Sequence, residues 1–406
     1  MKNISLHWQI LIALTGGILS GWLFPPAGPF VGWIGVIFLK MLKLIVVPLV
    51  FFSIVSGMAG MGRGRNLGRI ALKTLGLYVG TMLLAIVTGL FLVVIIKPGV
   101  GGGMALPEGF EGLQAQQKTL GDILLGIFPD NIFKAFSEPN MLGIIIFSIL
   151  LGAFIPTLEE SYSLKLTAIF EAFSSLMLKL TLFIIRFTPL GIFGLITQLI
   201  AQQANNPESL TRLGGGLVLY ALIVVGAILF HGLVTMSLVL YMAGVSPLKH
   251  FKGMATVLLT AFSTSSSNAT LPLSMEEVIE KAGVSKKIAS FTLPLGATIN
   301  MNGTALYECV AVIFIAQVYG IPLSITQILV VVVTALLAAI GSAGIPMAGL
   351  VMMSIILSAV GLPLEGIALI LAIDRPLDMM RTALNVYGDT CAAVIIARSE
   401  GEKIYS

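Results

Sequence analysis

Charged residues are rare near the C-terminus, and the few that occur repeat with helical spacing. At about 100° of rotation per residue, six polar side chains fall within an arc of about 100° on one helix: Asp374, Asp378, Arg381, Thr382, Asn385 and Asp389. The planar guanidinium of Arg381 matches a carboxylate, and the carboxylate of Asp378 accepts hydrogen bonds from an ammonium group. This helix therefore predicts a pocket for a small molecule that carries both groups.

The overall composition places this polar stripe in a membrane protein. Hydrophobic residues make up 57% of the 406 residues and charged residues only 10%, against about 25% charged in ordinary globular proteins. With a mean hydropathy of +1.02, too few polar side chains remain to cover a water-facing surface of this size. The sequence predicts an all-α polytopic membrane protein embedded in a lipid bilayer.

A bilayer restricts what the stripe can face. Each charge at the middle of a bilayer costs at least ~2.5–3.5 kcal/mol, so the stripe must face protein, water or a ligand. The alternative to ligand binding is that Asp378 and Arg381, three residues apart, only neutralise each other as a helical pair. Because that pairing does not explain the neighbouring Thr382, Asn385 and Asp389, ligand binding is favoured.

An earlier segment shows similar spacing. Its polar and small residues recur every four positions on one helix face: Gly296, Asn300, Thr304 and Glu308. Gly303 permits a local break that would free backbone carbonyls, and such carbonyls with a carboxylate are the ligands of a desolvated Na⁺. Asn300, Asn385 and Asp389 could supply this shell; alternatively, each amide only bonds a neighbouring helix.

Glu308 has no obvious cation within reach in the sequence. Burial favours the neutral form of a carboxyl group, so Glu308 should take up a proton near neutral pH. It is a proton carrier or a permanently neutral packing residue, and the sequence favours the first.

Two apolar stretches of the C-terminal half are interrupted by small polar residues and proline. The interruptions are residues 263–272 and 341–349, and polar-spotted segments follow them at 300–304 and 378–389. Non-helical backbone at membrane depth persists only where protein or water satisfies its N–H and C=O groups. Two interrupted segments at matching positions indicate a transporter binding site between inverted repeats, rather than ordinary helix kinks.

Apolar runs precede these interruptions, and about 20 residues are enough to span a bilayer. The runs are residues 8–24, 31–61, 70–96, 120–154, 166–200 and 213–242. Basic residues crowd the connections after the second and sixth runs, whereas 98–118 has few. By the positive-inside rule those connections are cytoplasmic, and an even number of spans would place both termini there.

Other features exclude whole classes of function. The net charge of +4 is too thinly spread for nucleic acid. The two cysteines and three scattered histidines indicate neither a disulfide framework nor a metal cluster. An enzyme is disfavoured because the run of serines at residues 265–267 lacks a nearby Lys or His that could act as a base. Residues 386–389 only partly match the Gly-x-Gly-Asp motif of intramembrane aspartyl proteases.

Four ordered motifs resemble those of the dicarboxylate/amino acid:cation symporter family, which includes prokaryotic glutamate and aspartate transporters and mammalian excitatory amino acid transporters. They are the serine-rich residues 265–272, the Asn-Met-Asn-Gly-Thr segment 300–304, residues 341–349 and residues 378–389. The resemblance covers essentially the whole chain. It implies a symporter of L-glutamate or L-aspartate coupled to H⁺ and/or Na⁺, without a cofactor, in the plasma membrane (a bacterial inner membrane).

The resemblance also implies an architecture of eight transmembrane helices, two re-entrant hairpins and a homotrimer. Residues 1–69 (spans 1 and 2) and 98–211 (spans 4 and 5) would form a scaffold. Residues 70–97 (span 3) and 212–406 (span 6, hairpin 1, span 7, hairpin 2 and span 8) would form a transport domain. That domain would move across the membrane like an elevator.

The family's substrate residues carry over by position. Asp378 would bind the substrate ammonium, and Arg381 with Thr304 the side-chain carboxylate. The remaining substrate-binding positions would be Ser265, Ser266, Ser267, Ile345, Gly349, Thr382 and Asn385. Ile345 and Gly349 belong to the second hairpin, which would be the extracellular gate.

The ion residues carry over in the same way. One sodium site would use Gly296, Asn300, Asn385 and Asp389, and a second would use carbonyls near Thr298 and Ser342. Glu308 matches the proton-carrying glutamate of the mammalian transporters.

Departures from the family concern the coupling ion. Sodium-coupled members usually have Asp where this chain has Asn302, and Met82 replaces a serine of the third span. Losing a carboxylate and a hydroxyl weakens a hard-cation shell. The arginine that many relatives carry is replaced by Ser265 in the first hairpin and by Met379 after Asp378. We therefore expect reliance on protons at least as much as on sodium.

Two alternatives stay open within the family. A C4-dicarboxylate carrier would have no use for Asp378, and a neutral amino acid carrier would have none for Arg381. A passive channel fits less well, because a pocket for ammonium and carboxylate behind two hairpins suits occlusion better than conduction.

Overall fold

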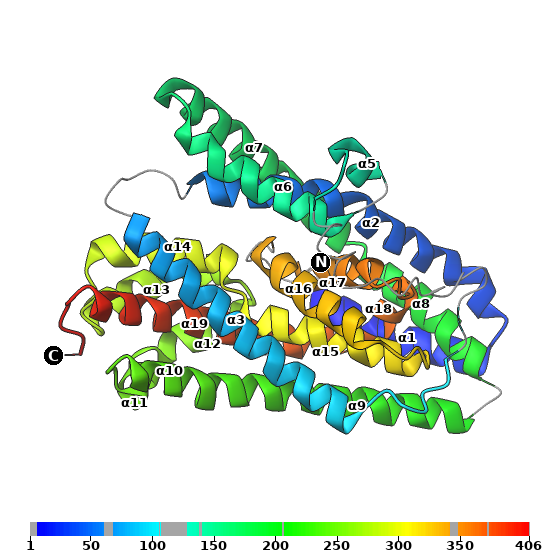
Figure 1. Ribbon diagram of the computed structural model, residues 1–406. Helices are drawn as coiled ribbons and strands as arrows, with labels where there is room; N and C mark the ends of the chain where they lie inside the picture. Colours follow the sequence, from blue (N-terminus) through cyan, green and yellow to red (C-terminus); the bar gives the residue numbers. More distant parts are fainter. Residues whose placement is uncertain are drawn as a thin grey trace, which may run out of the picture.

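The computed structural model describes residues 6–60, 68–104, 106, 128–137, 140–204, 207–341, 348–371 and 373–405. Helices, turns and short connections make up these residues, and none of the described part is a strand. The all-α prediction is confirmed. The helices form two sets, which lie side by side in Figure 1.

The first set comes from the N-terminal half. It contains α1 (Leu6–Leu23), α2 (Ala27–Gly60), α5 (Ile132–Ser137), α6 (Met141–Phe154), η1 (Ile155–Thr157), α7 (Glu160–Ile185) and α8 (Thr188–Gln203). Helix α2 packs along α6, α7 and α8, and α1 packs against α8.

The apolar run 166–200, predicted as one span, is divided between α7 and α8. Pro189 lies in the first turn of α8, directly after the break. Proline lacks the N–H that a helix interior needs but is tolerated at a helix start, so the chain begins a new helix there.

The second set combines α3 with the C-terminal half. Helix α3 (Gly68–Ile96) packs against α15 (Asn302–Val318) and α9 (Pro207–Phe230). Helix α9 continues through the π-helix η2 (His231–Thr235) into α10 (Met236–Met242). Because α15 is buried along almost its whole length, it forms the centre of this set (Figure 1).

The rest of the C-terminal half repeats one order of elements twice. The first copy follows α11 (Pro247–Gly253) and begins with the pair α12 (Ala255–Thr264) and α13 (Ser267–Glu280). It continues with α14 (Lys286–Ile299) and α15, which are separated by a break. The second copy has the pair α16 (Ile325–Gly341) and α17 (Ala348–Ala359), then η3 (Leu364–Gly366), α18 (Ile367–Leu371) and α19 (Asp374–Ser399). This order matches the two interrupted segments predicted from the sequence.

The first interruption is confirmed at the turn between α12 and α13. Ser265 has a left-handed backbone with φ of +51°, which ends α12. The Ser266 hydroxyl then accepts a hydrogen bond from the Ala269 N–H at 3.2 Å and caps α13. In the second interruption, residues 342–347 lie outside the described residues, and with them Ser342 and Ile345.

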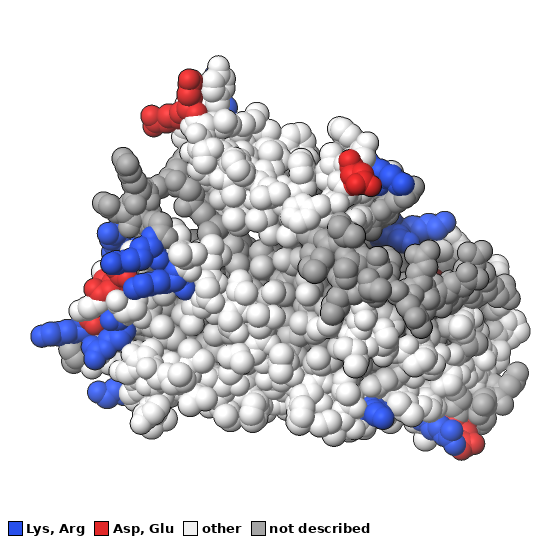
Figure 2. All heavy atoms as spheres, viewed as in Figure 1, with Lys and Arg blue, Asp and Glu red and all other residues white. Residues whose placement is uncertain are grey.

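Several helices have the length and composition of membrane spans. In the described part of the chain they are Ala27–Gly60, Arg69–Ile96, Glu160–Ile185, Leu210–Met242 and Lys286–Val318. Figure 2 shows a broad uncharged middle on the visible face, with Lys and Arg gathered at the end that holds the C-terminus. This distribution suits a protein whose middle lies in a bilayer.

Candidate functional site

Helix α19 carries the polar stripe, as predicted. Its polar side chains are buried: Asp374, Asp378, Arg381, Thr382, Asn385 and Asp389. Asp378 is 5% exposed and Arg381 only 1%. Buried charges persist only when paired or hydrogen-bonded, so the contacts of this stripe decide what it can bind.

Arg381 is the centre of an ionic cluster. Its Nη2 donates to Asp378 Oδ1 at 2.5 Å, and its Nη1 lies 3.4 Å from Asp374 Oδ1. Its guanidinium carbon lies 3.8 Å above the centroid of the Tyr307 ring, and the Tyr307 hydroxyl donates to Asp374 Oδ1 at 2.6 Å. The helical pair that the sequence left as an alternative to ligand binding therefore forms.

The pairing does not use all the donors of Arg381. Its Nε and Nη1 make no hydrogen bond with any described residue. A Cβ added at Gly349, near the start of α17, would lie 2.7 Å from Nη1. Arg381 thus presents donors beside the second hairpin, where an incoming carboxylate could accept them.

Asn385 ties α19 to the start of α15. Its Oδ1 accepts a hydrogen bond from the Gly303 N–H at 2.7 Å, and its Nδ2 donates to Thr304 Oγ1 at 3.1 Å. A Cβ at Gly303 would lie 2.6 Å from the Arg381 carbonyl oxygen, so only glycine permits this approach. The structure therefore brings Thr304, Asn385 and Arg381 together.

The break predicted within residues 300–304 is present, but the role predicted for Gly303 in it was wrong. Asn300 and Met301 leave helical geometry, with ψ of 79° and 56°, whereas Gly303 is inside α15. Asn300 and Thr304 therefore do not share one continuous helix face, although Thr304 and Glu308 do. The glycine serves close packing against α19 rather than the break itself.

The predicted first sodium residues are partly gathered. Asn300 Nδ2 donates to Asp389 Oδ1 at 2.8 Å, while Asn300 Oδ1 has no hydrogen-bond partner among the described residues. Gly296 also lies against the Asp389 carboxylate, where a Cβ would clash. A buried acceptor oxygen beside a carboxylate suits a hard cation. Asn385, expected in the same shell, is instead hydrogen-bonded to the start of α15.

The neighbouring amide of Asn302 suits a cation less well. Its Oδ1 accepts from Thr81 Oγ1 at 3.3 Å, but its Nδ2 is buried without a described partner. An amide N–H is a donor and repels a cation. No group of three His, Cys, Asp or Glu residues able to hold a metal occurs among the described residues, so a sodium ion would rely mainly on amide and carbonyl oxygens beside the Asp389 carboxylate.

Glu308 is fully buried in α15, one turn after Thr304. Neither carboxyl oxygen has a hydrogen-bond partner in the part of the chain described. An ionised carboxylate without partners is costly in the interior, whereas the neutral acid is tolerated.

The first hairpin supplies buried hydroxyls beside α19. Helices α12 and α13 both pack against α19, and Ser265 and Ser267 are buried. The Ser265 hydroxyl has no hydrogen-bond partner among the described residues, so it keeps its bonding capacity for a ligand. The Ser266 hydroxyl caps α13.

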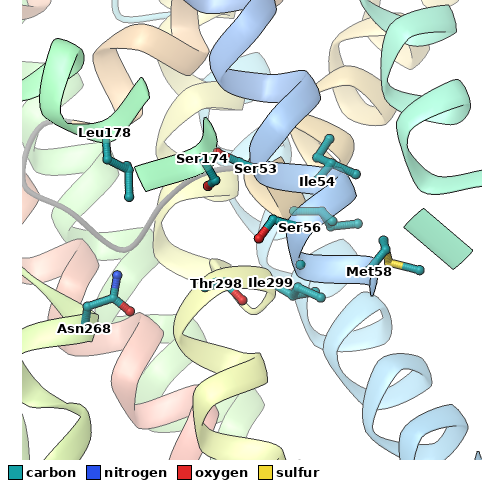
Figure 3. Close-up of a pocket in the computed structure, with 11 residues that line it drawn as sticks. Ser53, Ile54, Ser56, Met58, Ser174, Leu178, Asn268, Thr298 and Ile299 are labelled. Carbon is teal, nitrogen blue, oxygen red and sulfur yellow. The ribbon is translucent and has the colours of Figure 1, made fainter. Parts of the chain in front are cut away.

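A cavity of about 120 Å³ lies where the two helix sets meet. Figure 3 shows Ser53 and Ser56 of α2, Ser174 of α7, Asn268 of α13 and Thr298 of α14 around it. Thr298 is half-buried, and its hydroxyl donates to the Leu295 carbonyl at 3.0 Å. Both helix sets contribute polar side chains to a lining that is mostly apolar, and the cavity does not include the α19 cluster.

Comparison with known proteins identifies the family. The model of the sodium:dicarboxylate symporter family matches residues 6–399. The chain belongs to this family. It is therefore a multi-pass membrane protein and a cation-coupled symporter, not an enzyme.

Several relatives of the sodium:dicarboxylate symporter family are similar over nearly the whole chain. The proton/glutamate-aspartate symporter of Escherichia coli (strain K12) is 36% identical over 98% of this chain and 94% of its own length. The proton/sodium-glutamate symport protein of Bacillus caldotenax is 34% identical over 99% and 96%. The mouse excitatory amino acid transporter 3 (Mus musculus) is 35% identical over 90% and 78%.

Sequence reasoning assigned no role to three members of the cluster in this symporter: Asp374, Arg375 and Tyr307. Arg375 Nη1 lies 3.2 Å from Asp378 Oδ2, so Asp378 contacts two guanidinium groups. Asp374 belongs to the polar stripe predicted from the sequence, and Arg375 is the charged residue that follows it. Nothing in the sequence distinguishes Tyr307 from other core aromatics, because its stacking on Arg381 and its hydrogen bond to Asp374 depend on the fold.

Proposed function

We propose that this protein takes up L-glutamate or L-aspartate by secondary active symport with H⁺ and/or Na⁺. The observation that carries the proposal is the buried acid and base of α19, in which Arg381 retains donors beyond those that bind Asp378. An acidic amino acid offers a second carboxylate to Arg381 and an ammonium to Asp378. Relatives named as glutamate or aspartate symporters support the same substrate class.

In this proposal Thr304 assists Arg381 at the side-chain carboxylate. Thr382, Asn385 and the serines of the α12–α13 turn surround the main-chain carboxylate, and Gly349 lets α17 close over the guanidinium. Ile345 would belong to the same gate. Asn385 reaches both Gly303 and Thr304, so it couples the substrate position to the α14–α15 break.

Protons are proposed to contribute at least as much as sodium. Glu308 is the proton carrier, because its buried carboxyl has no described partner to hold a negative charge. Gly296, Asn300 and Asp389 line the favoured sodium position, which Asn385 would join by giving up its hydrogen bond from Gly303. Thr298 with Ser342 would form a second position. The side-chain N–H of Asn302 is a hydrogen-bond donor, so it weakens sodium binding at a third site beside Thr81.

The membrane potential constrains the number of ions. Glutamate carries a net charge of −1, so two or more cations must accompany it for an inside-negative potential to help. Each net charge moved inward gains ~2.3 kcal/mol per 100 mV. A tenfold substrate gradient costs about 1.4 kcal/mol. One proton alone would give electroneutral uptake.

The proposed movement is an elevator in a homotrimer of eight-span, two-hairpin chains in a bacterial inner membrane. Residues 1–69 and 98–211 are the scaffold, and 70–97 with 212–406 the transport domain. Lys73 Nζ of α3 lies 2.7 Å from Glu400 Oε1 beyond α19, which supports moving α3 with the C-terminal helices. The gathered basic residues support a cytoplasmic C-terminus, and by span number a cytoplasmic N-terminus.

A transport assay tests this function. Purified protein in proteoliposomes is given radiolabelled L-glutamate or L-aspartate while the sodium and pH gradients are imposed separately. We expect uptake of both substrates, including uptake driven by a pH gradient alone. Uptake of succinate in place of either amino acid would instead support the C4-dicarboxylate alternative, and uptake of serine without glutamate the neutral one.

A further inference from the structure

Arg375 is a second cation on the carboxylate proposed to bind the substrate ammonium. Arg375 Nη1 lies 3.2 Å from Asp378 Oδ2, while Arg381 Nη2 contacts Oδ1 at 2.5 Å. The two guanidinium groups therefore occupy different oxygens of one carboxylate. The oxygen held by Arg375 is the one that Arg381 leaves for another cation.

The two arginines differ in how firmly they are held. The Arg381 side chain is 1% exposed and is stacked on Tyr307. The Arg375 side chain is 19% exposed and lies at the margin of the buried cluster. A long side chain at that margin can leave the cluster more easily than the enclosed Arg381.

Helix stability does not explain the position of Arg375. It lies in the first turn of α19, where the helix dipole favours negative rather than positive charge. It also precedes its acidic partner in the chain, which is the less favourable order for a helical ion pair. The pair with Asp378 therefore points to a role in the site.

We propose that Arg375 is a positioning residue that neutralises Asp378 while the carrier is empty and yields Oδ2 to the substrate ammonium. The exchange replaces one positive charge by another, so the net charge around Asp378 stays constant. Without Arg375, the empty carrier would have to return across the membrane with Asp378 less well paired, which is unfavourable in a low-dielectric interior. This inference rests on the proposed function.

The test separates two transport modes in proteoliposomes. Exchange of internal for external L-glutamate uses only the substrate-bound carrier, whereas net uptake also requires return of the empty carrier. In Arg375→Gln we expect net uptake to fall by about tenfold or more, which corresponds to ~1.4 kcal/mol. Exchange should stay within about twofold of the unmodified protein, and Arg375→Lys should restore net uptake.

Arg398→Gln is the matched control, because it removes an exposed arginine from the same helix and should leave both modes unchanged. Equal loss of exchange and net uptake in Arg375→Gln would overturn the inference, and so would retention of both. If the unmodified protein performs neither exchange nor uptake of acidic amino acids, the proposed function fails first and this inference with it.

Discussion

Replacing Arg381 by threonine tests the substrate pocket most sharply. The guanidinium is buried, contacts Asp378 at 2.5 Å and Asp374 at 3.4 Å, and keeps Nε and Nη1 without a described hydrogen-bond partner. A hydrogen bond to a charged group contributes ~1.5–3 kcal/mol. A substrate carboxylate that accepts two such bonds would therefore lose ~3–6 kcal/mol in the variant, or a factor of about 10²–10⁴ in affinity.

The assay is equilibrium binding of radiolabelled L-glutamate to purified protein, with L-serine and L-alanine as competitors. Arg381→Thr should bind glutamate at least 100-fold more weakly, by the same arithmetic, and gain relative affinity for neutral amino acids. Arg381→Lys should lie between, because lysine keeps the charge but not the planar fork. Arg398→Thr removes an exposed charge from the same helix and should bind normally.

Folding must be checked separately, since the substitution leaves Asp374 and Asp378 with fewer partners. Breaking a buried ion pair costs ~3–5 kcal/mol, so a lower melting temperature is expected. Glutamate affinity within about threefold of the unmodified protein, in an Arg381→Thr sample that remains folded, would refute the pocket assignment.

Three further predictions concern the ions and stability. Glu308→Gln should abolish uptake driven by a pH gradient alone, and unchanged uptake would exclude it as the proton carrier. Asn302→Asp places a carboxylate beside Thr81, so uptake should become steeply sodium-dependent; an unaltered sodium response would contradict the assignment of that position. His250, between Thr390 and Tyr405, is outside the spans, and burial lowers its pKa to about 3. Because the unfolded histidine (pKa about 6.5) binds the proton first as pH falls, stability should drop by about 3 kcal/mol from pH 7 to pH 4. Thermal unfolding of His250→Gln should lack that part of the pH dependence, and an identical profile would show that His250 does not cause it.

The polar stripe of α19 could be predicted from sequence because charge is scarce around it. In an apolar segment each charged residue needs a partner, so helical spacing alone placed Asp378, Arg381 and Asp389 on one side. The α12–α13 turn was predictable for a similar reason, since a run of serines interrupts an apolar stretch. Both signals are local, and neither depends on knowing which helices touch.

Features that depend on packing between helices were harder to predict. Gly303 was interpreted as a break, but it allows α15 to approach the Arg381 carbonyl, which cannot be known without the position of α19. The division between α7 and α8 was missed because apolar continuity outweighed the signal of Pro189. The contact of Arg375 with Asp378 has helical spacing, yet its meaning required the second contact from Arg381.

The most direct measurement is a titration of the purified, unmodified protein with L-glutamate and L-aspartate, with sodium concentration and pH varied independently. If Asp378 and Arg381 together hold one acidic amino acid, binding is saturable and each substrate displaces the other in at least one combination of ions. If neither the heat of binding nor the amount of bound labelled substrate saturates at any sodium concentration or pH, the two residues only neutralise each other.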